Sequence, residues 1–160
     1  MKRKFERMGA KRLVDLYPYH IKSGEPEFLM MKRAAGKIYE GQWRMVGGKV
    51  QDDEAYWQAA LRELDEETSL PVIKMWTVPS LNHFYEAKTD SILLIPAFAA
   101  EIPHDAEPKL DEEHTTWKWM RYEECKTAIM WPEQKRLLGI IEQIVTSNQI
   151  ADEWIVSEDY

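Results

Sequence analysis

One segment of this chain, residues 48–70, carries the pattern of an amphipathic helix, and it stands among segments with the alternating pattern of strands. Four apolar side chains follow the i, i+3, i+4, i+7 spacing of one helix face: Trp57, Ala60, Leu61 and Leu64. Glu63, Glu66 and Glu67 fall beside this stripe, within an arc of about 100°. A helix of this kind buries its stripe against another layer, so the pattern predicts a packed domain that combines helix and sheet.

The remaining sequence predicts strands around this helix and a second helix near the end. We expect strands at 13–21, 27–33, 43–50, 72–87, 91–102 and 115–120, and helices at 54–68 and 132–146. Asp53 is the expected N-cap of the first helix. Pro18 favours an edge or an interrupted strand, and Pro79 and Pro96 predict breaks in their strands. The order predicts an α+β fold with a mixed sheet between helices.

Charge and composition divide the chain into three expected parts. Residues 1–11 form a basic arm, residues 12–146 one domain, and residues 147–160 an acidic tail with apolar positions at Ile150 and Trp154–Ile155. The net charge is −7 although the first 12 residues are strongly basic, so the body is acidic and is expected to repel a nucleic-acid polymer.

Membrane and redox properties follow from the same composition. The sequence lacks an apolar run of the roughly 18 residues that a membrane span needs, so we expect no membrane association. The start, MKRKFERMGAKR, has no apolar segment behind its positive charges, which argues against a secretory signal. The single cysteine, Cys125, rules out an intramolecular disulfide and is expected to be buried or inert. These features predict a cytoplasmic protein.

The acidic cluster on the first helix has two interpretations. Clustered carboxylates are most often a solvated helix face, and their mutual repulsion costs only a few tenths of a kcal/mol per pair. They are also the ligands that hard divalent cations such as Mg²⁺ prefer. Arg62 lies four residues before Glu66 and can pair with it. The helix pattern alone leaves both interpretations open.

The spacing of this segment resembles the signature of the Nudix hydrolases, the Nudix box. The positions that match are Gly48, Glu54, Arg62, Glu63, Leu64, Glu66, Glu67 and Leu70. One position departs from the signature, because Ser69 stands where the family has a glycine. That glycine ends the helix, where a left-handed residue is often required, so we interpret Ser69 as a change in helix termination.

The resemblance implies a fold, a metal site and a reaction. The fold would be the Nudix α/β/α sandwich. Glu63, Glu66 and Glu67 would bind Mg²⁺ or Mn²⁺, together with the carbonyl of Gly48, while Arg62 and Glu54 would orient the acids. The reaction would be attack of water on phosphorus, which breaks a phosphoanhydride bond of a small-molecule substrate. Bound metal ions provide the charge neutralisation and activated water that such a reaction needs.

A softer match lies outside the box. It consists of Asn82–Tyr85, Glu113–His114, Trp117 and Trp131–Pro132. In these features the chain looks like the pyrophosphatases that act on dihydroneopterin triphosphate and on nucleoside triphosphates such as dATP. Glu113 is either an exposed loop carboxylate or an additional catalytic group, as metal ligand or general base. His114 could orient a phosphate or a base, although a structural hydrogen bond is the commoner role.

Substrate contacts are predicted less directly. The candidates to stack on a base or pterin ring are Trp43, Tyr85, Tyr19 and Phe84, although most aromatic side chains simply fill a core. The candidates to hold phosphates are Lys49, Arg44, Lys32 and Arg33, with Lys49 favoured because it follows Gly48 directly.

These features predict a metal-dependent pyrophosphohydrolase that converts a nucleoside triphosphate or dihydroneopterin triphosphate to a monophosphate and pyrophosphate. A hydrolase of dinucleoside polyphosphates or nucleotide sugars is the alternative within the family. A non-catalytic nucleotide-binding module is the alternative from another class, disfavoured because the four Glu and the Arg of the box are all present. The sequence leaves the oligomeric state open between a monomer and a homodimer.

Overall fold

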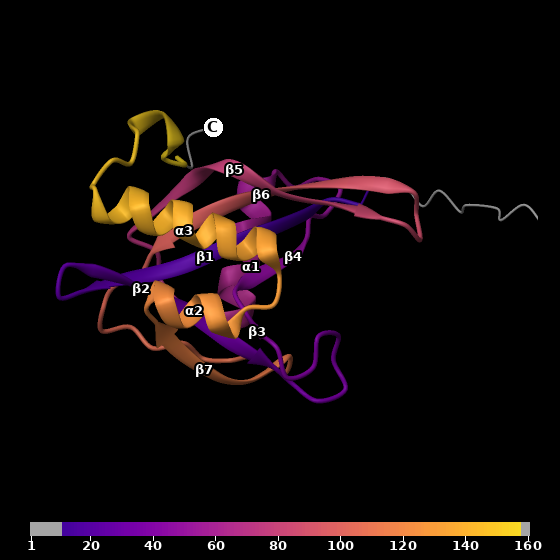
Figure 1. Cartoon of the computed structure of the whole chain (residues 1–160), viewed down its shortest axis with the longest axis horizontal. Coiled ribbons are helices and arrows are strands. Elements are labelled where there is room, and N and C mark those ends of the chain that lie inside the picture. The colour runs from indigo at the N-terminus through magenta and orange to yellow at the C-terminus, as the bar shows by residue number, and fades with distance from the viewer. Residues whose placement is uncertain (1–10, 158–160) are drawn as a thin grey trace, which may run out of the picture.

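The computed structural model describes residues 11–157, which form three layers with a mixed sheet in the middle (Figure 1). Helix α1 (Tyr56–Thr68) covers one face, and helices α2 (Tyr122–Ala128) and α3 (Pro132–Thr146) cover the other. The expected α/β/α sandwich is therefore confirmed. The first ten residues of the expected basic arm, and residues 158–160, lie outside the described part of the chain.

The sheet contains seven strands. They are β1 (Leu13–Lys22), β2 (Glu25–Arg33), β3 (Trp43–Arg44), β4 (Val46–Lys49), β5 (Lys74–Glu86), β6 (Ser91–Glu101) and β7 (His114–Met120). The order along the sheet is β3-β2-β1-β6-β5, with β4 paired to β1 and β7 paired to β2. The pair β1–β6 is parallel, and the other pairs are antiparallel.

The divergence of β1 and β2 opens a wedge within the sheet. The two strands pair only near their connecting turn, from Tyr19 opposite Phe28 to Lys22 opposite Glu25. Beyond this point β4 takes the place beside β1, and β3 takes the place beside β2. The expected single strand at 43–50 is thus two short strands. The wedge brings the glycines of β4 beside the start of β1.

The expectation that Pro18 marks an edge or interrupted strand was wrong. β1 is central, and Pro18 lies opposite Ala100 of β6. The carbonyl of Tyr19 accepts a hydrogen bond from Ile102 on the β6 side, so the backbone of Pro18 faces the opposite side. There it falls between Leu16, the last residue paired with β4, and Tyr19, the first paired with β2. A proline is tolerated because no partner strand requires its missing N–H.

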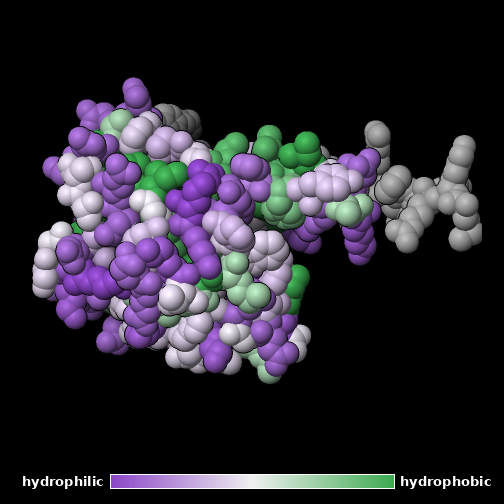
Figure 2. All heavy atoms as spheres, viewed as in Figure 1, coloured by the Kyte–Doolittle hydropathy of each residue, from purple (hydrophilic) through white to green (hydrophobic). Residues whose placement is uncertain are grey.

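Strands β5 and β6 form a long hairpin that projects from the body (Figure 1). Its register shifts between Thr77 and Leu81, around Pro79 and opposite Pro96, so both predicted breaks coincide with a real irregularity. Apolar side chains gather on the exposed side of this hairpin (Figure 2): Leu81, Tyr85, Ile92 and Leu94.

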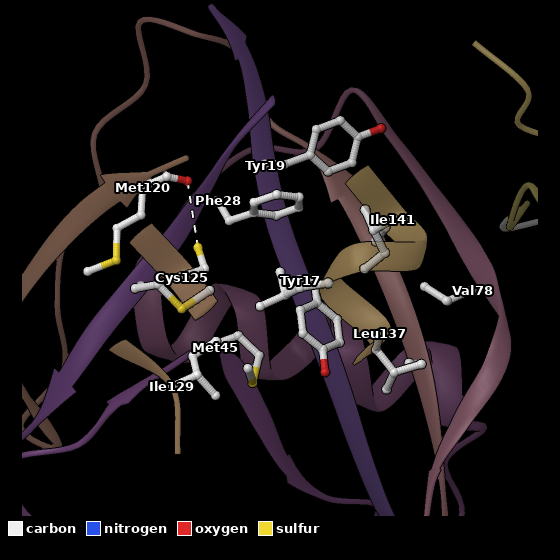
Figure 3. Packing of buried hydrophobic residues seen from close by; sticks show 14 of the residues in the cluster. Tyr17, Tyr19, Phe28, Met45, Val78, Met120, Cys125, Ile129, Leu137 and Ile141 are labelled. Atoms are coloured by element: carbon white, nitrogen blue, oxygen red, sulfur yellow. Dashed lines mark hydrogen bonds between the residues drawn. The ribbon is translucent and has the colours of Figure 1, made fainter. Parts of the chain in front are cut away.

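Two apolar clusters hold the layers together. On the α3 side, Tyr17 and Tyr19 of β1 pack with Leu137 and Ile141 (Figure 3). On the α1 side, fourteen buried residues, including Ala60 and Leu64 of the predicted stripe, form the second cluster. Burial of each large apolar side chain contributes roughly 1.5–3 kcal/mol.

The predicted N-cap of α1 was wrong, whereas the conformation expected at its C-terminal end is confirmed. The helix begins at Tyr56 with Ala55 as N-cap, so Asp53 is not the cap. The backbone N–H of Ala55 donates instead to Oε1 of Gln58 over 2.8 Å. At the other end Ser69 has φ 55° and ψ 22°, the left-handed conformation expected at this position.

The C-terminal part contains an element that the sequence pattern did not reveal. Helix α2 has only seven residues, too short for a periodic signal, and it buries Cys125. After α3, the short 3₁₀ helix Asp152–Trp154 packs against β5, where Trp154 stacks on Trp76 at 6.4 Å between ring centroids. None of the described helices combines the length and apolar character needed to cross a membrane.

Candidate active site

The three carboxylates of α1 lie at the wedge between β1 and β2, but in different environments. Glu67 is almost fully buried, with 4% of its surface exposed. Glu63 is mostly buried, and Glu66 is more than half exposed. The helix therefore presents its acidic face toward the sheet at Glu67 and toward solvent at Glu66.

Arg62 ties the start of the segment to the acidic face. Its guanidinium binds both oxygens of Glu54, at 2.6 and 3.0 Å, and donates to the carbonyl of Lys49 at 2.9 Å. The Nη1 atom also donates to Glu63 at 3.0 Å and to Glu66 at 3.2 Å. The hydrogen bonds from Arg62 hold the pKa of Glu54 down to about 2, so Glu54 stays ionised. These contacts fix the loop that precedes α1 against the helix.

The two glycines of β4 allow close packing at the site, Gly48 against α1 and Gly47 against β1. A Cβ atom on Gly48 would collide with the carboxylate of Glu63. A Cβ atom on Gly47 would lie 3.0 Å from the carbonyl oxygen of Val14. The backbone N–H of Gly47 donates to Oε2 of Glu67 over 3.4 Å. A side chain at Gly48 would therefore displace a carboxylate from the centre of the site.

The electrostatics of Glu63 and Glu67 fit a bound cation. Burial, and then the neighbouring carboxylates of Glu63 and Asp111, raise the pKa of Glu67 to about 9. Burial also raises the pKa of Glu63. Oxygen ligands held close together out of water are what Mg²⁺ and Mn²⁺ bind, and a cation would stabilise both carboxylates in their ionised form.

The ligands are not drawn together on one point in this structure. Among residues 11–157, no group of three or more acidic, histidine or cysteine side chains is arranged to hold a metal ion. Arg62 accounts for part of this, because it holds both Glu63 and Glu66. The donor set nevertheless fits a divalent cation in its chemistry, because carboxylate and carbonyl oxygens are the ligands that Mg²⁺ and Mn²⁺ prefer.

A second group of polar residues faces Glu67 from the start of β7. His114 is buried, with Nε2 3.7 Å from Oε1 of Glu67 and Nδ1 2.8 Å from Oδ1 of Asp111. Glu113 is about half exposed, and its Oε2 accepts a hydrogen bond from Arg33 over 3.1 Å. The loop before β7 thus brings Glu113 and His114 to the same cavity as Glu67.

That cavity has a volume of about 350 Å³ and is lined by residues of the acidic site as well as by aromatic side chains. Its lining includes Gly48, Lys49 and Glu67, and also Phe84 and Trp131. The two ring centroids are 6.1 Å apart. The acidic helix and an aromatic wall are thus parts of one continuous space.

Only some of the predicted substrate-binding residues line the cavity. Lys49, Arg44, Arg33 and Phe84 line the cavity. Arg44 lies over the ring of Tyr39, with its guanidinium carbon 4.1 Å from the ring centroid.

Three of the predicted stacking residues and Lys32 lie elsewhere. Trp43 packs against the core, and Tyr19 is buried, accepting a hydrogen bond from Trp76. Tyr85 is 59% exposed on the hairpin and donates to Asp90. Lys32 also lies outside the residues that line the cavity.

Sequence reasoning missed a buried polar group at the inner end of the cavity. Asp15, Asn82 and Gln134 come from β1, β5 and α3, and each is less than 10% exposed. Nδ2 of Asn82 donates to Oδ2 of Asp15 over 2.9 Å, and Nε2 of Gln134 donates to the same atom over 3.3 Å. The one available signal was a lone charge, Asp15, within the apolar strand Leu13–Tyr19.

The fold and the site identify the family. The model of the NUDIX domain matches residues 19–138, three quarters of the chain, and the chain belongs to the Nudix family.

Two curated proteins and one solved structure illustrate this relationship. An asymmetrical bis(5'-nucleosyl)-tetraphosphatase from Caenorhabditis elegans is 28% identical over 123 residues, 75% of this chain and 86% of that protein. An oxidized purine nucleoside triphosphate hydrolase from Mus musculus is 29% identical over 114 residues, 71% of this chain and 69% of that protein. The crystal structure of a binary complex of C. elegans Ap4A hydrolase has a TM-score of 0.72 and 24% identity, covering 86% of this chain and 99% of that chain.

Proposed function

We propose that this protein is a divalent-metal-dependent hydrolase that cleaves the bond between the α and β phosphates of a nucleoside triphosphate or dihydroneopterin triphosphate. The observation that carries the proposal is the single cavity that joins the acidic helix, at Glu67, to the aromatic wall of Phe84 and Trp131. A phosphate chain at one end and a flat ring at the other would fill such a space.

The residues of this chain would act on the phosphates as follows. Glu63, Glu66, Glu67 and the carbonyl of Gly48 would hold Mg²⁺ or Mn²⁺. When bound, the metal supplies charge neutralisation for phosphate oxygens and lowers the pKa of an attacking water. Arg62, anchored by Glu54, would keep the acids in place.

Cations and the loop before β7 would complete the site. Lys49 lines the cavity beside Gly48 and would bind the phosphate oxygens that the metal leaves free, whereas Arg44, the other predicted phosphate ligand, packs toward Trp131 at the ring end. Glu113 would accept the proton of the attacking water, or else bind the metal, since it lines the same cavity as Glu67. The products would be a monophosphate and pyrophosphate.

A dinucleoside polyphosphate is the second candidate substrate. The relative from C. elegans, a bis(5'-nucleosyl)-tetraphosphatase, favours it. The relative from mouse, an oxidized purine nucleoside triphosphate hydrolase, favours a triphosphate instead. We place the triphosphate first because the described cavity has one aromatic wall, which suits one ring.

Cell location and assembly belong to the proposal as well. Cys125 is a buried free thiol, which suits the reducing cytoplasm. The protein acts as a monomer or as a homodimer, and light scattering distinguishes the two.

A hydrolysis panel tests the proposal. Nucleoside triphosphates, dihydroneopterin triphosphate, diadenosine tetraphosphate and a nucleotide sugar are incubated with Mg²⁺, with Mn²⁺ and with EDTA, and the products are separated by chromatography. We expect pyrophosphate from the triphosphates, only with metal. Orthophosphate as the primary product, or turnover of the dinucleotide alone, would overturn the assignment.

A further inference from the structure

The inner end of the cavity carries polar atoms that the structure leaves without partners. Oε1 of Gln134 is completely buried and accepts no hydrogen bond within the described chain. A buried, unpaired carbonyl oxygen costs about 1–3 kcal/mol. Gln134 itself is 2% exposed and lines the cavity. The position therefore suits a ligand that donates a hydrogen bond.

Asp15 adds a second acceptor at the same place. The side-chain hydrogen bonds that its carboxylate accepts from Asn82 and Gln134 both end on Oδ2. Neither of these bonds engages Oδ1, the second oxygen of the carboxylate. Burial raises the pKa of the Asp15 carboxyl, while the two amides and the charge of Arg44 act in the opposite direction. A buried carboxylate whose described hydrogen bonds both come from neutral amides is stabilised by a ligand that brings further N–H donors to it.

Arg44 provides a donor beside these acceptors. Its Nη1 atom is buried and donates to no described residue, while its guanidinium packs on Tyr39 and toward Trp131. The cavity lined by Phe84 and Trp131 therefore also contains an unpaired acceptor on Gln134, the carboxylate of Asp15 and an unpaired donor on Arg44.

We propose that Asp15 and Gln134, with Asn82 holding Asp15 in place, form a subsite that selects rings carrying a 2-amino-4-oxo edge. Such an edge, which pterins carry at positions 2 and 4 and guanine carries at the equivalent positions 2 and 6, presents a ring N–H, an amino group and a carbonyl oxygen side by side. The N–H and amino group pair with the acceptors of Asp15 and Gln134, and Arg44 faces the oxygen. Adenine presents a ring nitrogen lone pair where guanine has the N–H, and that lone pair is repelled by the carboxylate.

This inference rests on the proposed function only in taking the cavity as the substrate site, so its test avoids hydrolysis. Binding of GMP, AMP and dihydroneopterin monophosphate is measured by calorimetry in EDTA, without metal or turnover. We expect GMP or the pterin to bind at least about 10-fold more tightly than AMP, in line with the discrimination of a bidentate contact. Binding by only one of the two 2-amino-4-oxo ligands would support the inference and identify the source of the ring.

Two variants test the residues, with one matched control. Asp15→Asn keeps the shape but replaces an acceptor by a donor, so the preference for GMP over AMP should disappear or reverse. Gln134→Met removes the second acceptor and should weaken GMP binding about 10-fold while leaving AMP binding unchanged. Asp105→Asn, an exposed loop position, controls for the loss of one charge. Thermal unfolding verifies the fold, and the Met variant carries the test if the Asn variant does not fold.

The outcomes separate this inference from the proposed function. The subsite is overturned if the wild type binds GMP and AMP equally. It is also overturned if Asp15→Asn and Gln134→Met both prefer GMP over AMP as strongly as Asp105→Asn does. Either result holds even if triphosphates are hydrolysed. A ring preference lost in the variants, together with no hydrolysis of any triphosphate, supports the subsite and overturns the proposed reaction.

Discussion

Arg62 holds Glu54 through both carboxylate oxygens, at 2.6 and 3.0 Å, and so joins the loop before α1 to the helix eight residues further on. The same guanidinium reaches Glu63, Glu66 and the carbonyl of Lys49. One side chain therefore positions both the acidic face and the strand end that carries Gly48.

Arg62→Lys should lower kcat by about 10- to 100-fold, because lysine cannot make the two-point contact with Glu54 that holds the acids in place. The measurement is steady-state hydrolysis at saturating metal. Arg136→Lys is the matched control, since Arg136 also binds both oxygens of a glutamate, Glu133, on α3. If both variants lose activity equally, Arg62 has no special role.

Glu66→Gln and Glu67→Gln should each reduce activity by more than about 100-fold, because each would remove a charged ligand from a shared metal site. Without metal, Glu67→Gln should unfold at an equal or higher temperature, since it removes a buried carboxylate repelled by Glu63. Activity assays and calorimetry in EDTA check the two effects.

The control for these variants is Asp65→Asn, which changes an exposed acid on the same helix. It should leave both activity and stability nearly unchanged. Glu66 or Glu67 variants that hydrolyse substrate within a few-fold of wild type would refute the metal assignment.

Glu113→Gln separates the roles that the sequence left open. A general base should lose about 10²–10⁴-fold in kcat with little change in KM, and a metal ligand should be rescued in part by higher metal concentration. Glu112→Gln is the control. Asp111 is not a suitable control position, because its Oδ1 accepts hydrogen bonds from His114 and from the backbone N–H of Glu113. A loss no larger than that of Glu112→Gln would leave water activation to α1.

Ser69→Gly should stabilise the protein by about 0.5–1 kcal/mol, because Ser69 has φ 55° and glycine adopts this conformation without steric cost. Urea unfolding gives the change in free energy. Ser147→Gly at the end of α3 is the contrasting control, because Ser147 has φ −86° and gains nothing from glycine. Equal effects at both sites would show that the left-handed conformation is not the cause.

Cys125 should resist thiol reagents in the folded protein. Burial raises the pKa of its thiol to about 12, so the reactive thiolate is absent at pH 8. Because the folded pKa lies above the unfolded one, the contribution of Cys125 to stability is present below pH 9 and is lost as the pH rises toward 12. Spectrophotometric titration with and without urea measures the exposure, and rapid labelling of the native chain would contradict it.

The sequence by itself determined the elements whose signals are local. The helical spacing of Glu63, Glu66 and Glu67, the strong match of the segment 48–70 and the left-handed position of Ser69 all depend on residues within a few turns of one another. Helix period and cap geometry are set by neighbouring residues, so they could be predicted without knowing the fold.

Only the tertiary structure decided what the acidic helix faces. Pro18 could lie in a central strand because β1 changes partners beside it, from β4 to β2. That change depends on the pairing of β1 with a strand that begins only at Val46, which the local sequence around Pro18 does not specify. Asp15, Asn82 and Gln134 meet only because the register of β1 with β4 and β6, and the packing of α3, bring them to one cavity. Burial and hydrogen-bond partners arise from contacts between residues distant in the sequence. These contacts decide that Asp15 is a buried acceptor and that the amide of Gln134 is left unpaired, and the local sequence does not contain them.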